Sequence, residues 1–481
     1  MNFKMIKYTL GWLLLFESVF LLIPLITAMI FTEWRMALVF LASAAISAAL
    51  GWLATLRRPE NRILYSRDGF ALVAISWITL SIFGSLPFLF SGVTTSFVDA
   101  LFETVSGFTT TGASIFADVE ALPASIIIWR SFMHWIGGMG VLVFVMAFLP
   151  LGGAHNLHIM RAESTGPSVS KLVPRVRKTA IILYGIYIAM TVLQTVLLLI
   201  GKMSFFEAIN TALSTAGTGG FGFKSDSLGS YSPYIQVVVT VFMLLFSVNF
   251  NTYYLAFRLR FRETVNTELR TFLCIVLAAV LIISLDLHNA GLFASFGEGL
   301  RHAAFTVSSI ISTTGFATVD FNIWPGLSRT LIVLLMFIGA CAGSTGGGIK
   351  VSRIIIFVKG AVREIGQIIH PKQVKKLTLD KRPIDHEVVR SVNAYLVCFF
   401  LIFAASVALI SFNEYDLVTN FTAVSAMINN VGPGLELVGP TQSFGHFSGF
   451  SKLVLVFDML AGRLELFPML ILFSPRAYKK H

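Results

Sequence analysis

Four short segments of the sequence could bring backbone carbonyl oxygens around a small cation. Each joins an amphipathic, helix-like stretch to a turn of small residues centred on glycine. They read FVDALFETVSGFTTTGAS from Phe97, FFEAINTALSTAGTGGFG from Phe205, LRHAAFTVSSIISTTGFA from Leu300 and DLVTNFTAVSAMINNVGPG from Asp416. Carbonyl oxygens turned toward a common axis can replace the hydration shell of an ion, and glycine permits the backbone conformations that this needs. The four segments therefore predict a selectivity filter built by one chain.

Aligning the central glycines places them at spacings of 107, 96 and 117 residues, at Gly112, Gly219, Gly315 and Gly432. One such turn in a membrane protein is commonly a helix break or a packing contact. Four in register between hydrophobic helices favour a pore. The residues expected to surround the ion are Thr110, Thr111, Gly112, Thr218, Gly219, Thr313, Thr314, Gly315, Asn430, Val431 and Gly432.

The elements that must hold these turns cross a membrane. The 481 residues are 56% hydrophobic and 13% charged, with a mean hydropathy of +0.79, and apolar runs of about 20 residues recur. We expect an all-α polytopic membrane protein, with two leading helices followed by four helix–P-loop–helix repeats around one pore per protomer. The expected divisions are 1–68, 69–175, 176–266, 267–385 and 386–481. The second helices of the repeats are expected at Ser125–Pro150, Tyr231–Arg258, Trp324–Val358 and Gly449–Leu472.

The net charge of +11 is distributed in clusters between alternate helices. Basic residues also flank the first and last helices, at Lys4, Lys7, Lys479 and Lys480. This is the positive-inside pattern, so we expect a multi-pass protein with both termini in the cytoplasm. Since no long soluble basic face is present, nucleic acid is not an expected partner; membrane lipid is.

A glycine-rich run interrupts the expected helix of the third repeat. Five of the ten residues from Gly339 to Gly348 are glycine, and each costs roughly 1 kcal/mol in a helix. The run therefore predicts a flexible loop midway across the membrane, where broken helices mark ion pathways; the alternative is a simple kink. Its GxxxxG spacing imitates a phosphate-binding loop, but Ile349 replaces the lysine and no βαβ context surrounds it. We expect no nucleotide bound to this chain.

Arg463 lies in an apolar helix, where an arginine is expensive unless it faces a cavity or a partner. Counted from the outer end of that helix it lies roughly 20 Å down, at the depth of the glycine run. We expect the two to meet beneath the filter. Two interpretations stay open: a fixed positive charge on the ion path, or a structural salt bridge to another helix.

The turns TTTGAS, TAGTGGFG and STTGFA, with the stretch WRSFMHWIGGMG from Trp129 to Gly140, resemble the Trk/Ktr/HKT potassium transporter superfamily, and most of all its bacterial TrkH and TrkG members. The resemblance implies a homodimer in the bacterial inner membrane, with a pore in each protomer that prefers K⁺ to Na⁺. It also implies a cytoplasmic TrkA-type regulatory subunit that binds nucleotide. Glycine at position 112 agrees with K⁺ as the transported ion, because sodium-selective relatives have serine there. The filter would comprise Thr109–Ala113, Ala216–Gly220, Ser312–Phe316 and Asn429–Pro433.

The resemblance makes the glycine-rich run an intramembrane gate. The expected gate residues are Gly343, Ser344, Thr345, Gly346, Gly347, Gly348, Lys350 and Arg463. The function that follows is gated uptake of potassium ions; the alternative is a secondary transporter that couples K⁺ or Na⁺ to a second ion. No Ser/His/Asp set, paired carboxylates or HExxH motif appears, so we do not expect an enzyme. Carboxylates that follow the filter turns could concentrate cations at an outer mouth, at Asp118, Asp226, Asp320 and Glu436.

Overall fold

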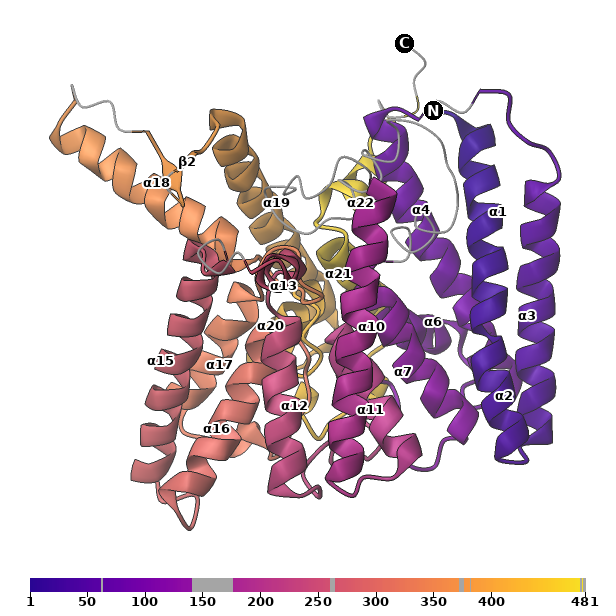
Figure 1. Ribbon diagram of the computed structural model, residues 1–481, viewed down its shortest axis with the longest axis horizontal. Coiled ribbons are helices and arrows are strands. Elements are labelled where there is room, and N and C mark those ends of the chain that lie inside the picture. Colours follow the sequence, from indigo (N-terminus) through magenta and orange to yellow (C-terminus); the bar gives the residue numbers. More distant parts are fainter. Residues whose placement is uncertain are drawn as a thin grey trace.

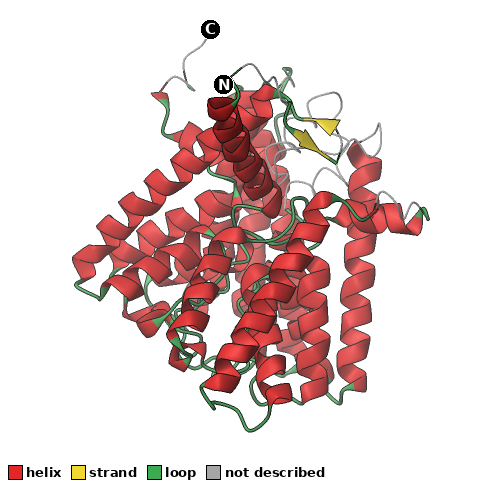
Figure 2. Ribbon diagram, turned by 90° about the vertical axis from the view of Figure 1, so that its left-hand side faces the viewer, coloured by secondary structure: helices red, strands yellow, loops and turns green. Residues whose placement is uncertain are grey.

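A computed structural model describes residues 1–61, 64–140, 176–259, 264–371, 376–380, 382–475 and 478. Helices packed side by side make up nearly all of it (Figures 1 and 2). The start of α1 and the last helix, α22, lie at the same end of the molecule (Figure 1). A two-stranded hairpin lies between α18 and α19 at that end. The expected all-helical, polytopic architecture is confirmed, with this small hairpin as an addition.

The two leading helices pack closely along their length. A Cβ placed on Gly11 would lie 2.8 Å from the carbonyl oxygen of Gly51, so the two backbones approach at a small-residue contact. The first leading helix is bent into two parts near Leu21. The bounds are α1 Phe3–Phe20, α2 Leu22–Ile30 and α3 Trp34–Thr55.

Each of the four following units begins with a long helix and continues with a short pore helix. The long helices are α4 Ser66–Gly84, continued by α5 Leu86–Ser91, then α10 Val176–Ile200, α15 Thr267–Asn289 and α19 His386–Ile410. The pore helices are α6 Phe97–Phe108, α11 Phe205–Gly217, α16 Phe296–Ile311 and α20 Leu417–Ile428. Every pore helix starts at a side-chain oxygen that accepts a hydrogen bond from the backbone N–H three residues later, which satisfies a free donor of the first turn. These capping residues are Ser96, Ser204, Ser295 and Asp416.

Within the described residues, the second helices of the second, third and fourth units are each broken. The predicted break in the third unit is confirmed, but the continuous helices predicted over Tyr231–Arg258 and Gly449–Leu472 are wrong. The chain turns by 91° between α12 and α13, and two residues with positive φ, Glu465 and Leu466, lie between α21 and α22. The bounds are α7 Ala124–Gly138, α12 Pro233–Phe246, α13 Phe250–Phe257, α17 Gly326–Ile338, α18 Val351–Ile369, α21 Gly449–Arg463 and α22 Phe467–Leu472. The predicted extension of the first of these to Pro150 lies outside the described residues.

Short elements complete the chain outside the membrane-length helices. The strands β1 Thr378–Leu379 and β2 Arg382–Pro383 form the antiparallel hairpin. In the described part of the chain, the single turns of 3₁₀ helix are η1 Phe321–Ile323, η2 Ser411–Asn413, η3 Glu436–Val438 and η4 Phe444–His446.

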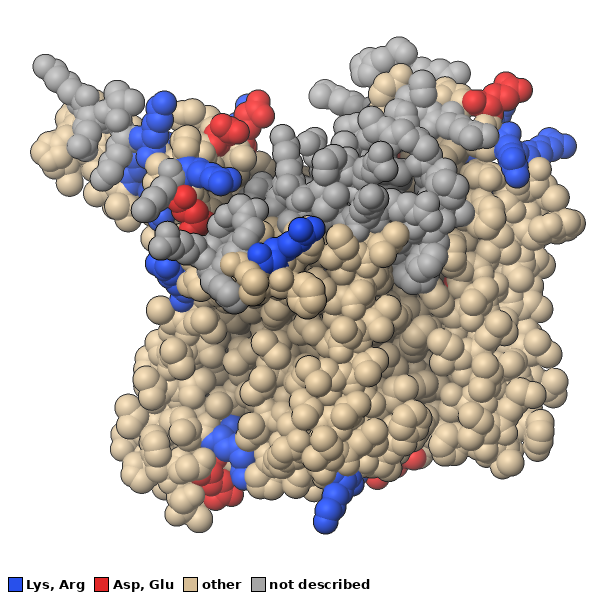
Figure 3. All heavy atoms as spheres, in the orientation of Figure 1, with Lys and Arg blue, Asp and Glu red and all other residues tan. Residues whose placement is uncertain are grey.

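The face shown in Figure 3 carries a wide uncharged belt between two ends where charged side chains lie. Among the described residues, six helices are long and apolar enough to cross a membrane, or seven when the bent pair α12 and α13 is counted as one span. Belt and spans together agree with a multi-pass membrane protein. Of the basic residues predicted to flank the first and last helices, Lys479 and Lys480 lie outside the described residues.

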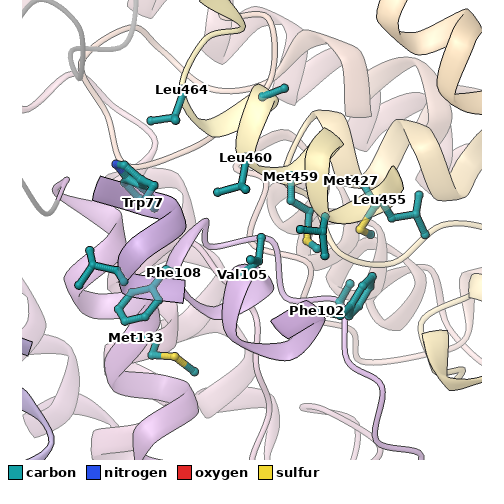
Figure 4. Close-up of a cluster of buried hydrophobic side chains, with 14 of the residues drawn as sticks. Trp77, Phe102, Val105, Phe108, Met133, Met427, Leu455, Met459, Leu460 and Leu464 are labelled. Carbon is teal, nitrogen blue, oxygen red and sulfur yellow. The ribbon is translucent and has the colours of Figure 1, made fainter. Parts of the chain in front are cut away.

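A buried apolar cluster joins the first unit to the fourth (Figure 4). Phe102 and Phe108 of α6 are almost fully buried, as are Leu455 and Met459 of α21. Trp77 of α4 lies on the same cluster. The first pore helix therefore packs against α21 of the fourth unit, more than 300 residues later in the sequence. A closed ring of repeats requires such a contact between the first and the last unit.

Candidate functional site

The four pore helices end in one repeated backbone conformation. In each, the first residue with positive φ is not glycine: Thr110 (φ 57°), Thr218 (55°), Thr313 (59°) and Asn430 (55°). Two residues further on, a glycine again has positive φ: Gly112 (83°), Gly220 (79°), Gly315 (81°) and Gly432 (101°). Non-glycine residues adopt this region rarely and at a cost of order 1–3 kcal/mol. Its recurrence at four equivalent places indicates one turn design used four times.

This pattern corrects the predicted register of the second turn. A backbone hydrogen bond from the residue before the glycine closes each turn onto its own pore helix. The four bonds are Thr111 N to Ser106 O, Gly219 N to Ser214 O, Thr314 N to Ser309 O and Val431 N to Ala426 O, at 2.8–2.9 Å. Gly219 is thus the counterpart of Thr111, and the counterpart of Gly112 is Gly220. The Gly219–Gly220 doublet in the sequence indicates that either glycine could be the counterpart of Gly112.

The four turns close into a ring. A Cβ added to Gly112 would lie 1.9 Å from the Gly219 carbonyl oxygen of the next turn. The same clash recurs for Gly220 with Thr314 O at 1.9 Å, for Gly315 with Val431 O at 2.2 Å, and for Gly432 with Thr111 O at 2.7 Å. Each glycine therefore faces the carbonyl of the following turn, and the fourth faces the first. Only glycine fits at these positions, because any side chain would push a neighbouring carbonyl aside.

Side chains of the turn residues form contacts both between and within the turns. The Asn430 amide donates to Thr111 Oγ1 at 3.0 Å and to the Met459 carbonyl oxygen at 2.9 Å. Within the first turn, the hydroxyls of Thr109 and Thr111 lie 2.8 Å apart, and those of Ser312 and Thr314 lie 2.6 Å apart in the third. Apart from Pro433, which is half-buried, the predicted filter side chains are buried. The structure brings all four predicted turns together at one place.

An ion pair behind the first turn had not been singled out in the sequence. Glu103 of α6 and Arg130 of α7 are buried and 2.7 Å apart. Glu103 also accepts a 2.9 Å hydrogen bond from the backbone N–H of Ile115, just beyond the turn. The guanidinium of Arg130 lies over the ring of Phe221, 4.0 Å from its centroid. The pair thus holds the outer ends of two neighbouring turns, since breaking a buried pair strongly destabilises its surroundings.

His134 packs against the second turn and is fully buried. Its ring is stacked on Phe221 at 4.2 Å between centroids. A Cβ on Gly219 would lie 2.2 Å from its Nδ1. The imidazole therefore limits residue 219 to glycine for a reason of packing, and not of backbone conformation.

A depression opens on one side of the ring and is lined by Gly112, Gly220, Gly315 and Gly432. The charged side chains that line it are Arg130 and Lys224. The acids predicted at an outer mouth are absent from this lining: Glu436 is paired with Arg329, and Asp118 accepts from the backbone N–H of Glu120 at 3.0 Å. These contacts favour a local structural role for Asp118 and Glu436 over the attraction of cations.

The loop between α17 and α18 lies against the other side of the ring. Its Gly347 N–H donates to Thr313 Oγ1 at 2.6 Å. Cβ positions on Gly347 and Gly346 would lie 2.4 Å and 2.8 Å from the carbonyl oxygens of Asn429 and Ser312. These carbonyls belong to the beginnings of the third and fourth turns, whereas the depression is lined by their ends. The loop therefore covers the ring from the side opposite the depression.

The break between α12 and α13 provides the seat for this loop. The carbonyl oxygen of Ser247 accepts from the Cys341 N–H at 3.1 Å, and the Gly343 carbonyl accepts from the Phe250 N–H at 3.1 Å. The Thr345 hydroxyl donates to Phe246 O at 3.2 Å. A continuous helix would use these groups internally, so the break frees them for the loop.

Arg463 reaches the loop from the fourth unit, as predicted. Its Nη1 donates to the carbonyl oxygen of Thr345 at 2.7 Å, and its Nη2 donates to Gly138 O at 2.8 Å and to Gly137 O. Lys350, buried at the end of the loop, donates to the Gly346 carbonyl oxygen. Two cationic side chains therefore hold the loop through its carbonyl groups, beneath the ring.

These features define a class. A polytopic helical chain in which four re-entrant turns surround one axis, covered on one side by an intramembrane loop, is a four-repeat P-loop transport protein. The chain belongs to the TrkH family of cation transport proteins, whose match covers residues 35–480.

Relatives match over the whole chain. The chain is 35% identical to the Trk system potassium uptake protein TrkH of Halomonas elongata and 33% identical to that of Escherichia coli, and each comparison covers 100% of both chains. The crystal structure of the potassium transporter TrkH from Vibrio parahaemolyticus superimposes with a TM-score of 0.89 at 32% identity, again over 100% of both chains. The repeat architecture described above is thus the TrkH fold.

Proposed function

We propose that this chain carries potassium ions into the bacterial cell through the ring of four turns. The observation that carries the proposal is the closed cycle in which every glycine of the ring faces the carbonyl of the next turn. Such a cage can replace water around a monovalent cation. The relatives named as potassium uptake proteins support K⁺ as the ion. The repeats that build the cage are those divided at 69–175, 176–266, 267–385 and 386–481.

The filter in this proposal consists of the residues named from the sequence, with Gly220 added as the counterpart of Gly112. The intramembrane loop acts as the gate, through Gly343–Gly348, Lys350 and Arg463. Contacts of the loop with Ser312, Thr313 and Asn429 support a closed state. Arg463 adds a positive charge beneath the ring, which disfavours a cation there until the loop moves.

The protein acts as a homodimer in the inner membrane, with both termini in the cytoplasm and a cytoplasmic TrkA-type subunit that binds nucleotide. The word "system" in the names of the relatives supports a further component. The common end of α1 and α22 supports one side for both termini. Apolar side chains exposed around the belt, such as Leu38 and Leu277, are suited to contact with lipid.

Flux measurements on the purified chain in proteoliposomes test the proposal. Radioactive Rb⁺ uptake should follow the K⁺ gradient and the voltage alone, and excess K⁺ should compete far better than Na⁺. Uptake that requires a second ion gradient would instead identify a coupled secondary transporter. Equal competition by K⁺ and Na⁺ would contradict the assigned filter.

A further inference from the structure

The carboxylate of Glu268 joins the two ends of the intramembrane loop. Glu268 stands in the first turn of α15 and is 8% exposed. Its Oε1 accepts a 2.7 Å hydrogen bond from the N–H of Ala342, near the start of the loop, and a 3.2 Å bond from the N–H of Ser352, just after its end. A single carboxylate oxygen of α15 therefore holds both ends of the loop.

The loop needs such a fastening because its own backbone is weakly constrained. Gly339, Gly343 and Gly348 have φ values of 69°, 70° and 75°, and Lys350, which is not glycine, has φ 79°. A glycine-rich segment gains much conformational entropy when it is released. Hydrogen bonds to a charged acceptor are stronger than neutral ones and oppose that release.

The hairpin of β1 and β2 holds Thr267, the residue before Glu268. Asp380, at the tip of the hairpin, accepts from the Thr267 N–H at 2.8 Å and from its hydroxyl at 2.6 Å. The hairpin is also tied to α18, because Lys359 Nζ donates to the Thr378 carbonyl oxygen at 3.0 Å. β2 lies between α18 and α19 at the end where α1 begins (Figure 1). The hairpin thus connects an exposed surface to the turn of helix that carries Glu268.

We propose that Glu268 is a positioning residue that keeps the loop closed, and that Asp380 of the hairpin sets the position of Glu268. A load applied to the hairpin from the exposed end then loosens the loop by moving the first turn of α15. This inference rests on the proposed role of the loop as the gate and adds the route by which the gate is controlled. Neither Glu268 nor Asp380 contacts the four turns; Glu268 acts through backbone N–H groups, and Asp380 acts through the N–H and the hydroxyl of Thr267.

A native cysteine reports the state of the loop directly. Cys341 lies beside Ala342 and is 1% exposed, whereas Cys274 is exposed and Cys398 is half-buried. In the full chain with Cys274→Ser and Cys398→Ser, a maleimide should label Cys341 slowly. Glu268→Ala should raise the labelling rate about tenfold, the size expected when hydrogen bonds to a charged group are lost. Glu268→Gln keeps an oxygen acceptor and should fall between the two.

The same variants are assayed for Rb⁺ flux in proteoliposomes, and their melting temperatures are measured. Loop release predicts faster labelling together with higher flux, whereas general unfolding predicts faster labelling with lower flux and would overturn the proposal. Glu387→Gln is the matched control, since Glu387 is an exposed acid in the first turn of α19. It should leave labelling and flux unchanged.

The hairpin step has its own comparison. Asp380→Ala should speed Cys341 labelling severalfold, and Asp385→Asn, an exposed acid that makes no capping hydrogen bond, should not. Equal rates in the two variants would overturn the role of the hairpin. Shortening the Gly339–Gly348 run tests the gate itself. If that deletion raises flux while Glu268→Ala does not, the gate stands and the role of Glu268 is refuted.

Discussion

The backbone of Gly112 lies so close to the carbonyl oxygen of Gly219 that a Cβ on residue 112 would stand 1.9 Å from that oxygen. This contact joins the first turn to the second, and three equivalent contacts complete the ring. Real Cβ–oxygen contacts are never that short, so a larger residue must displace the carbonyl. Any displacement changes the distance from that carbonyl to an ion on the axis, and several predictions on transport depend on this geometry.

Serine at Gly112 should weaken the preference for K⁺ over Na⁺. The added Cβ displaces the Gly219 carbonyl, and the left-handed backbone at φ 83° strains the new residue by about 1 kcal/mol or more. We expect the ratio of K⁺ to Na⁺ competition against Rb⁺ uptake to fall about tenfold, since about 1.4 kcal/mol corresponds to that factor. Serine at Gly315 should act similarly. Gly185→Ser is the control, because a Cβ there meets no atom within 4 Å; a loss of selectivity in this control would refute the explanation.

The corrected register of the second turn has a distinctive test. Alanine at Gly219 meets the ring of His134, so the second change His134→Ala should restore much of the lost flux. Alanine at Gly220 meets Thr314 O and has φ 79°, so the same second change should not rescue it. Rb⁺ uptake by the two single and two double variants measures this difference. If His134→Ala instead rescued Gly220→Ala, the result would favour Gly219 as the counterpart of Gly112, which is the register predicted from the sequence.

Replacing Arg463 with Gln should raise flux. The change removes a positive charge beneath the ring and weakens the hydrogen bond to the Thr345 carbonyl oxygen, which is 2.7 Å long. Charged hydrogen bonds contribute about 1.5–3 kcal/mol, so an increase of about tenfold is expected in folded protein. Arg463→Lys retains the charge and should keep most of the block. Flux equal to that of the parent in both variants, with unchanged melting temperature, would assign the arginine a purely structural role.

The depression should respond more to its lysine than to the nearby acids. Lys224 lines it, whereas Asp118 and Glu436 do not. Neutralising Lys224 to Gln should therefore increase uptake about twofold at low ionic strength and low K⁺, and the difference should vanish near physiological salt, where the Debye length is about 8 Å. The paired change Asp118→Asn serves for comparison and should have little effect. A salt-independent effect of Lys224→Gln would contradict an electrostatic cause.

Much of this protein was readable from residue type and spacing. Local residue types are enough to predict three features: the apolar runs of membrane length, the four glycine-centred turns and the glycine-rich run after α17. The rise per residue of an α-helix was enough to place Arg463 at the depth of the loop. The contact between Arg463 and Thr345 bears out that reasoning.

Other features were decided by tertiary contacts. The doublet Gly219–Gly220 allows two registers, and only the neighbouring carbonyls and the His134 ring select one. The break after Phe246 has no glycine or proline to announce it; it is stabilised by loop groups from the third unit, about 100 residues later in the chain. Glu268 is an ordinary acid in a first helical turn until the fold brings Ala342 and Ser352 to its carboxylate. Residue types thus determined which segments enter the membrane and which can turn there, whereas the pairing of polar backbone groups across units, compulsory in a medium without water, decided how they meet.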